Sequence, residues 1–323
     1  MKFSFRYDIL PIIMKELYKD DYSKIYNCDN LELLGRLPDD MVNLIYCDIL
    51  YNTGKTFADY NDNLGSTKEA VEWYRPRIEE MKRVLAKNGS VFIHCNWRLD
   101  SYMRILLDEI FGEKNFHNRI YRKHSNERGF YNNFDSQVDI ILYYLKDPAN
   151  FVFNQQYNEK PQITPLFEDG FIEQRSYKLI GIDLSKQNKH WLVGRAQLEK
   201  LIANEELRII DGLPYRFSNV QAIGNLWSEP QMLDTYNRNA PSDAYDTPKP
   251  DACLERIIST CSNESDLVAD FFLGGGTTAV VSKKLGRKFI GCDINEKSCE
   301  VTVQKLKKIL ATKTNLPEVF KAF

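Results

Sequence analysis

The sequence lacks the features that mark several specialised classes of protein. No apolar run approaches the roughly 20 residues of a membrane-spanning helix, and charges occupy the amino terminus where a signal peptide would be apolar. The seven cysteines are odd in number and never form a C-x-x-C pair, and the four histidines show no metal-ligand spacing with them. We therefore expect a cytoplasmic protein with reduced thiols, no membrane partner and no metal.

An excess of charge of either sign is also missing. Lys and Arg together number 43 and Asp and Glu number 45, which gives a formal net charge of -2. This balance excludes a uniformly basic nucleic-acid coat, although it permits a local basic face. With 323 residues, of which 43% are apolar and 12% aromatic, the chain is long enough for one large α/β domain with a sizeable insert.

The chain does contain an alternation of short apolar runs and helical patterns. The runs that predict strands cover residues 41–52, 90–95, 138–145, 267–272 and 288–293. The apolar spacings that predict helices cover residues 31–37, 69–86, 100–111, 277–285 and 302–310. Strands that alternate with helices favour a doubly wound, mainly parallel α/β sheet.

One long stretch, residues 150–245, interrupts this alternation because it is polar, irregular and aromatic, with scattered glycine and proline. The break predicts an inserted region over residues 150–245, flanked by two halves of the sheet domain over residues 22–149 and 246–323. Residues 1–21 remain as an N-terminal arm.

A glycine-rich turn, Leu273 to Thr278, joins a predicted strand to a predicted helix. Glycines let a ligand approach the backbone, and the helix beyond offers unpaired N–H groups. The next strand ends at Asp293, where a carboxylate can hold two ribose hydroxyls. The turn matches neither G-x-G-x-x-G nor the P-loop, so an adenosine without phosphates is the favoured ligand. A tight turn that binds nothing is the simpler alternative.

A second cluster, Asp48-Ile49-Leu50-Tyr51-Asn52, follows the first predicted strand. Its carboxylate could accept one hydrogen of a planar amine, a backbone carbonyl could accept the other, and the aromatic ring could stack on the amine's ring. Taken alone, a strand-end aspartate beside a core tyrosine would explain the same residues.

Taken together, five segments resemble the β-class DNA amino-methyltransferases, in the order that is typical of that class. The segments run from Asp48 to Asp62, Glu79 to His94, Thr247 to Ile258, Asp270 to Thr278, and Gly291 to Asp293.

Two departures from the family pattern stand out. Ile49 and Leu50 replace the two prolines of the family's Asp-Pro-Pro-Tyr, and Gly275 replaces a serine. Losing the prolines predicts a softer loop and a slower enzyme.

The resemblance implies a Rossmann-like methyltransferase fold with the catalytic half first and an inserted target-recognition region. It also implies methyl transfer from S-adenosylmethionine to N6 of an adenine flipped out of double-stranded DNA. The catalytic residues that it implies are Asp48, Ile49 (through its carbonyl) and Tyr51. The implied cofactor contacts are Asp29, Thr247, Lys249, Asp270, Phe272, Gly274, Gly276, Thr277 and Asp293. DNA phosphate contacts are expected from the basic run that contains Arg119, Arg122, Lys123 and Arg128.

Three other interpretations stay open at this point. The chain could be a weakly active or inactive DNA-binding relative that needs a partner subunit, or it could act on N4 of cytosine or on RNA. A nucleotide-dependent oxidoreductase is the generic alternative for a glycine-rich turn. Possible partners are a second copy of the chain and a cognate restriction endonuclease, as in restriction-modification systems.

Overall fold

The computed structural model describes residues 14–56, 61–124, 134, 136–176, 178–233 and 249–314. Two of the predicted site residues, Thr247 and Arg128, lie outside these ranges. The chain divides into two compact units, of which the first combines Met1–Asn154 with Asn225–Phe323 and the second is Gln155–Gly224. Within the described ranges, no helix is both long and apolar enough to cross a membrane.

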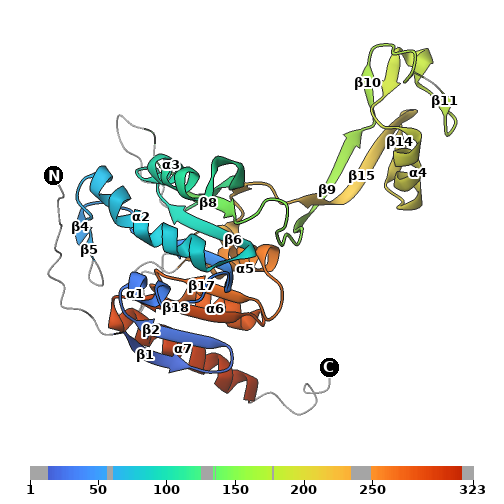
Figure 1. The fold of residues 1–323 in the computed structure, drawn as a ribbon. Helices are drawn as coiled ribbons and strands as arrows, with labels where there is room; N and C mark the ends of the chain where they lie inside the picture. Colours follow the sequence, from blue (N-terminus) through green and yellow to red (C-terminus); the bar gives the residue numbers. More distant parts are fainter. Residues whose placement is uncertain are drawn as a thin grey trace. The chain divides into compact units, whose positions relative to one another are not determined.

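The first unit is built on a nine-stranded sheet in the order β1-β2-β18-β17-β3-β6-β8-β7-β16 (Figure 1). Its strands are β1 (Lys15–Lys19), β2 (Ser23–Asn27), β3 (Val42–Asp48), β6 (Leu85–Cys95), β7 (Phe116–Lys123), β8 (Val138–Leu145), β16 (Leu226–Trp227), β17 (Leu267–Asp270) and β18 (Lys288–Asp293). An antiparallel pair of short strands, β4 (Lys55–Thr56) and β5 (Asn61–Asp62), follows β3 along the chain.

The five consecutive strands β2, β18, β17, β3 and β6 are mutually parallel, so their carboxyl ends meet at one edge. Beyond β6 the sheet turns antiparallel through β8 and β7. From β3 the chain continues to β6 on one side of the sheet, and from β17 it continues to β18 on the other side. The junction of β17 and β3 is therefore a topological switch point, where α/β proteins bind ligands. The expected doubly wound, Rossmann-like fold is thus confirmed.

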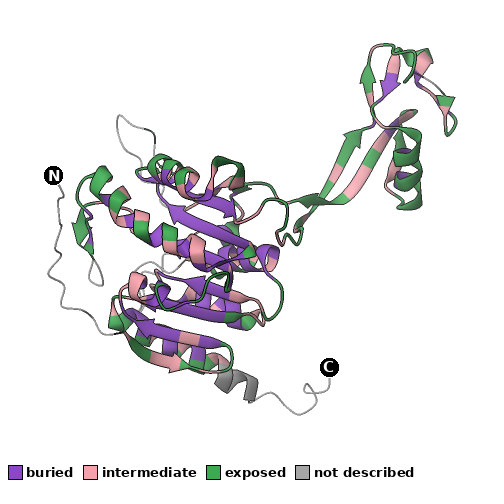
Figure 2. Ribbon diagram, viewed as in Figure 1, coloured by how far each residue is buried: buried purple, intermediate pink, exposed green. Residues whose placement is uncertain are grey.

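The helices form two groups, each packed within itself. One group holds α1 (Asn30–Leu34), α2 (Thr67–Val84) and α3 (Asp100–Phe111), and the other holds α5 (Asp251–Cys261), α6 (Thr277–Lys284) and α7 (Glu296–Thr314). The central strands between them are almost entirely buried (Figure 2). Apolar runs, rather than alternating patterns, are what a sheet covered on both faces requires.

Helix α2 shows how local sequence sets an element that positions the site. Ser66 and Glu69 form a reciprocal capping box at its start. Its buried stripe includes Tyr74 and Ile78, and the helix crosses from β3 to β6. Pro76 lies inside the helix and not in its first turn, because the helix begins at Thr67.

The structure also contains strands that the pattern did not predict. β1 and β2 fall in a polar segment whose apolar runs, Leu17-Tyr18 and Ile25-Tyr26, are only two residues long, yet β2 pairs along its whole length with β18. Strand β6 begins at Leu85, where the helix pattern was expected to continue to residue 86. Leu85 is fully buried by pairing with β3, so sheet contacts override its helical preference here.

The second unit has regular structure of its own, although its sequence looks irregular. Three strands, β9 (Tyr157–Pro165), β15 (Leu213–Ala222) and β14 (Leu207–Ile210), form an antiparallel sheet. Two antiparallel strand pairs and α4 (Arg195–Ala203) also belong to the unit. The pairs are β10 (Phe167–Asp169) with β13 (Lys189–Trp191), and β11 (Lys178–Leu179) with β12 (Ile182–Asp183). A small apolar cluster around Trp191 holds the unit together, as expected for that tryptophan.

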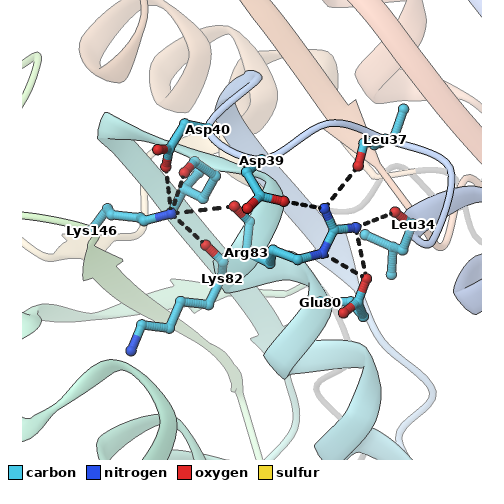
Figure 3. A network of polar contacts seen from close by, with 9 residues as sticks. Leu34, Leu37, Asp39, Asp40, Glu80, Lys82, Arg83 and Lys146 are labelled. Carbon is cyan, nitrogen blue, oxygen red and sulfur yellow. Dashed lines mark hydrogen bonds and ion pairs between the residues drawn. The ribbon is translucent and has the colours of Figure 1, made fainter.

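Two cations secure the end of α2, at the edge of the sheet opposite the carboxyl ends (Figure 3). Arg83 donates to the Leu34 and Leu37 carbonyls at 2.7 and 2.8 Å. Lys146 donates to the carbonyls of Lys82 and Leu85 at 2.7 and 2.6 Å and pairs with Asp40 at 2.8 Å. The carbonyls at a helix C-terminus have no intrahelical partner, so a cation there satisfies them and complements the helix dipole.

Replacing Lys146 with methionine should lower the free energy of unfolding by about 2–3 kcal/mol, because several carbonyls lose a charged donor. Lys87→Met is the matched control, since Lys87 is exposed on strand β6 and its loss should change stability by less than about 0.5 kcal/mol. Urea denaturation of the two variants measures the difference. Equal stabilities would contradict this role for Lys146.

Candidate active site

The predicted catalytic and cofactor residues meet at the carboxyl edge of the parallel strands. Asp48 ends β3, Asp270 ends β17 and Asp293 ends β18. The sheet order places β17 directly beside β3, so the glycine turn and the Asp48 segment are neighbours although they are more than 200 residues apart in sequence.

Asp48, Tyr51 and Lys249 form one polar cluster. The Tyr51 hydroxyl donates to Asp48 Oδ1 at 2.8 Å, and Lys249 Nζ lies 3.1 Å from Asp48 Oδ2. Lys249 Nζ also lies 3.1 Å from the Tyr51 hydroxyl oxygen. Burial raises the pKa of Tyr51 well above its ordinary value, so its hydroxyl stays protonated and acts as a donor. Lys249, which was expected to contact the cofactor, therefore lies against the carboxylate that is predicted to be catalytic.

Hydrogen bonds hold the loop that follows Asp48. The Ile49 N–H donates to the His94 carbonyl at 3.1 Å, and the buried Tyr74 hydroxyl donates to the Leu50 carbonyl at 2.8 Å. The buried Asp62 carboxylate accepts from the N–H groups of Asn52 and Thr53 at 2.9 and 3.0 Å. A proline at position 49 could not make the first of these bonds. The loop thus has constraints of its own in place of the family's two prolines.

The glycine turn has the backbone that its sequence predicts. Gly274 and Gly276 have φ values of 49° and 74°, which glycine adopts without steric cost. Asp293 Oδ2 accepts the Gly274 N–H at 2.8 Å, and Oδ1 accepts the Asn295 N–H at 2.9 Å. A methyl group on Gly276 would lie 2.1 Å from Thr302 Oγ1, so this position has no room for a side chain. Thr277 starts α6 beyond the turn.

Asp270 is a buried acid that stabilises the same turn. Its carboxylate accepts from the Phe272 N–H at 3.0 Å and from the Thr278 hydroxyl at 2.7 Å. Burial raises its pKa to about 7, against the effect of these two bonds. Asp270, which was expected to contact the cofactor, therefore holds the two ends of the turn through Phe272 and Thr278.

Asp29 follows the carboxyl end of β2 and caps the start of α1. Its Oδ1 accepts the Leu31 N–H at 2.8 Å as a helix cap, and its Oδ2 pairs with Arg77 at 2.9 Å. The next residue, Asn30, is buried and donates to the Phe271 carbonyl, and its Oδ1 has no partner among the described residues. Phe272 is half-buried against the ring of Trp73, with centroids 6.2 Å apart.

These residues fit a nucleoside cofactor such as S-adenosylmethionine. The Asp293 carboxylate has acceptor capacity beyond its two backbone bonds, which suits a pair of ribose hydroxyls. The orphaned Asn30 oxygen and the half-buried Phe272 ring offer a polar contact and an apolar surface at the same strand ends. Lys249 offers a positive charge on the side that faces Asp48.

The residues expected to contact DNA differ in how far they are buried. Arg122 cannot contact phosphate, because it is fully buried and its guanidinium pairs with Asp139 at 2.7 Å and with the Met232 carbonyl at 3.0 Å. That expectation is corrected here: the part of the basic run up to Lys123 lies in strand β7 (Phe116–Lys123), whose alternate residues point into the protein. Arg119 and Lys123 are half-buried, and Arg119 lies 3.5 Å from Asp100.

The sequence interpretation missed a line of buried polar groups beneath Asp48. His94 on β6 is fully buried, with Nδ1 3.8 Å from Asp48 Oδ1 and Nε2 3.4 Å from Asp139 Oδ2. With Arg122, these residues form a row, here called the polar row, with one member on each of the neighbouring strands β3, β6, β8 and β7. The available signal was polar residues inside otherwise apolar strands, at Asp139 and His94.

The fold and this site together define a Rossmann-like methyltransferase. The family model N6_N4_Mtase, described as DNA methylase, matches residues 42–304, and the chain belongs to that family. The family's enzymes use S-adenosylmethionine as methyl donor.

Individual relatives of the chain share between 25% and 29% sequence identity with it. The chain is 26% identical to the DNA adenine methyltransferase YhdJ of Escherichia coli over 90% of this chain and 84% of that protein. It is 29% identical to the type II methyltransferase M.EcaI of Enterobacter cloacae, covering 82% of this chain and 65% of that one. The Mod subunit of the type III enzyme StyLTI of Salmonella typhimurium is 25% identical, and the chain spans only 54% of its length.

Solved structures agree on the fold. The PvuII DNA methyltransferase (cytosine-N4-specific) matches with a TM-score of 0.55 at 15% identity, covering 92% of this chain and 93% of that one. The M1.HpyAVI–SAM complex matches with a TM-score of 0.51 at 20% identity, covering 88% and 98%. At such low identities the likeness supports the fold alone.

Replacing Gly276 with alanine should destabilise the protein by at least about 2 kcal/mol and weaken S-adenosylmethionine binding, because the methyl group meets Thr302 and φ is positive. Gly275→Ser is the matched control: φ there is not in the left-handed region, and the family carries serine. Thermal unfolding and calorimetric titration with the cofactor measure both effects. A Gly276→Ala protein that binds and melts like the control would refute this assignment.

The raised pKa of Asp270 predicts a pH-dependent stability difference between the wild type and Asp270→Asn. Below pH of about 4 the carboxyl is protonated in both folded and unfolded chains and has no ionisation cost. Between pH of about 4 and 7 only the unfolded chain ionises, so the wild type loses stability as pH rises. The free energy of unfolding of the variant minus that of the wild type should rise by up to about 3 kcal/mol from pH 5 to 7. A flat difference would contradict the raised pKa.

Proposed function

We propose that the protein transfers a methyl group from S-adenosylmethionine to N6 of an adenine in double-stranded DNA. The observation that carries the proposal is the Asp48–Tyr51 pair at a strand end directly beside the glycine turn. YhdJ, which covers most of the chain, is named as a DNA adenine methyltransferase, in agreement with the aspartate that opens the motif.

Two acceptors at this site match the two hydrogens of an amino group. The Asp48 carboxylate has one oxygen toward Tyr51 and the other toward Lys249, and each oxygen retains a second acceptor position. Among the residues that the structure describes, nothing donates to the Ile49 carbonyl. The half-buried Tyr51 ring provides a face on which the flipped base can stack.

Holding both N6 hydrogens turns the nitrogen lone pair toward the donor. S-adenosylmethionine, when bound, supplies an electrophilic methyl group. The methyl group would pass to N6 as its bond to the sulfonium sulfur breaks, which leaves the rest of the cofactor as a neutral thioether. Positive charge then develops on N6, and the fixed Asp48 and Ile49 oxygens stabilise that charge. One N6 proton then leaves toward these acceptors, which restores a neutral methylated amine.

The cofactor half of the site is assigned in the same proposal. Asp293 holds the ribose, Phe272 and Asp29 border the adenine, and Lys249 binds the carboxylate of the methionine moiety. Gly274, Gly276 and Thr277 allow close approach at the turn, and Thr247 remains an expectation from the family pattern alone. The ion pair of Asp29 with Arg77 supports its side chain in a fixed orientation.

DNA recognition is assigned to the unit Gln155–Gly224 and to the half-buried Arg119 and Lys123. Basic side chains in this unit include Arg175, Lys178, Lys186, Lys189, Arg195 and Arg216. Phosphate contacts set position and base contacts set sequence. A homodimer and a separate restriction endonuclease are the partners that fit, since the StyLTI relative is named as the Mod subunit of a restriction-modification enzyme.

Labelled S-adenosylmethionine with unmethylated genomic DNA should give label on N6-methyladenine. Asp48→Ala should lower the rate at least about 100-fold, because an electrostatic acceptor at the reacting nitrogen is lost. Asp48→Asn, which keeps one oxygen, should retain more activity than the alanine variant. Digestion to nucleosides and chromatography identify the labelled base.

Cofactor binding by both variants, measured by calorimetry, is the control for folding. Label on N4-methylcytosine would move the protein to the cytosine branch. No label from the wild type, with cofactor and DNA still bound, would refute the proposed activity.

A further inference from the structure

We propose that His94 is a positioning residue for methyl transfer, because its ring and its backbone together fix the Asp48–Ile49 segment. This inference rests on the proposed function, since it concerns the same reaction. It assigns a role to the members of the polar row other than Asp48, which the mechanism above does not use.

His94 touches the catalytic segment through both its main chain and its side chain. Its carbonyl accepts the Ile49 N–H at 3.1 Å, and strand pairing sets His94 directly opposite Asp48. Its ring Nδ1 lies 3.8 Å from Asp48 Oδ1 and its ring centroid lies 6.3 Å from that of Tyr51. A shift of this residue would therefore move both groups that accept the amine hydrogens.

The ring of His94 is itself held in one orientation. Burial lowers the pKa of His94, so the imidazole is neutral near pH 7. Burial also raises the pKa of Tyr46, whose hydroxyl lies 2.7 Å from Nδ1. Nε2 faces the Asp139 carboxylate at 3.4 Å, which favours the ring hydrogen on Nε2 and leaves Nδ1 to accept the hydrogen of the Tyr46 hydroxyl. The bond with Tyr46 therefore holds the rotation of the ring, and the charge of Asp139 favours one tautomer, while Nε2 makes no hydrogen bond to a described residue.

Arg122 anchors the far end of the polar row. It pairs with Asp139 at 2.7 Å and donates to the Met232 carbonyl at 3.0 Å. Burial opposes the charge on Asp139, but the contact with His94 and the charges of Lys249 and Arg122 hold the pKa of Asp139 well below its usual range. The carboxylate facing His94 is thus permanently charged at neutral pH.

A role in stability alone does not account for this arrangement. A buried ion pair contributes little net stability, because desolvation offsets most of the attraction, and apolar residues of similar size often do as well. A polar row that runs from Arg122 to a position beneath Asp48 is instead suited to orientation. Outer groups that orient reacting residues commonly change activity by about 10- to 100-fold when they are removed.

Single-turnover methylation at saturating cofactor and DNA tests the role. His94→Gln should lower the rate about 10- to 100-fold while KM for both substrates changes less than about 3-fold. His94→Asn should recover part of the rate, because its side-chain oxygen can accept the Tyr46 hydroxyl near the position of Nδ1. Thermal unfolding identifies any variant that fails to fold.

Tyr46→Phe provides the second test if the His94 variants do not fold. It removes only the hydroxyl that holds the ring and should lower the saturated rate about 2- to 10-fold. The matched control is Tyr143→Phe, which removes another buried hydroxyl from the same sheet, in contact with Cys261 and Ser90 and not with the polar row. In the His94→Gln background, Tyr46→Phe should have no further effect.

The outcomes separate the two proposals. Variants that melt at lower temperature but methylate at the wild-type saturated rate would overturn the positioning role and leave the proposed function intact. A wild type that methylates no DNA base would overturn the proposed function, and the role of His94 in that reaction with it.

Discussion

The half of the sheet domain that precedes the insert is arranged around one carboxylate, Asp48, at the end of the buried strand β3. Asp48 must stay charged and keep a fixed orientation, yet only 28% of its side chain is exposed. Lys249 pairs with Oδ2, the Tyr51 hydroxyl donates to Oδ1, and His94 Nδ1 lies 3.8 Å from the same Oδ1. Without these partners the two carboxylate oxygens of Asp48 would lose the contacts that hold them in one orientation.

The sheet makes this arrangement possible because it joins two halves of the chain that are far apart in sequence. Strand β17 carries the glycine turn and pairs with β3, which carries Asp48. The same parallel order brings Asp293 to the edge through β18. An insert can therefore interrupt the chain between the halves without disturbing the site, and Gln155–Gly224 folds around an apolar cluster of its own.

Much of this could be predicted from the sequence where the signal is local. The apolar run Val138–Leu145 is strand β8, and the turn at Gly274 and Gly276 has the positive φ that its glycines indicate. Contacts between distant strands carry no local signal. Thus β2 was missed because its order comes from β18, and Arg122 was taken for a surface cation because its partner, Asp139, belongs to another strand. The pairing of Lys249 with Asp48 was hidden for the same reason.

The structure of the protein bound to target DNA and a non-reactive analogue of S-adenosylmethionine would test the central claim most directly. The account predicts a flipped adenine whose N6 lies within hydrogen-bond distance of both Asp48 and the Ile49 carbonyl, with the Tyr51 ring stacked on the base. His94 should keep its contacts with Tyr46 and Ile49 in that complex. A bound base whose amino group points away from Asp48 would contradict the account.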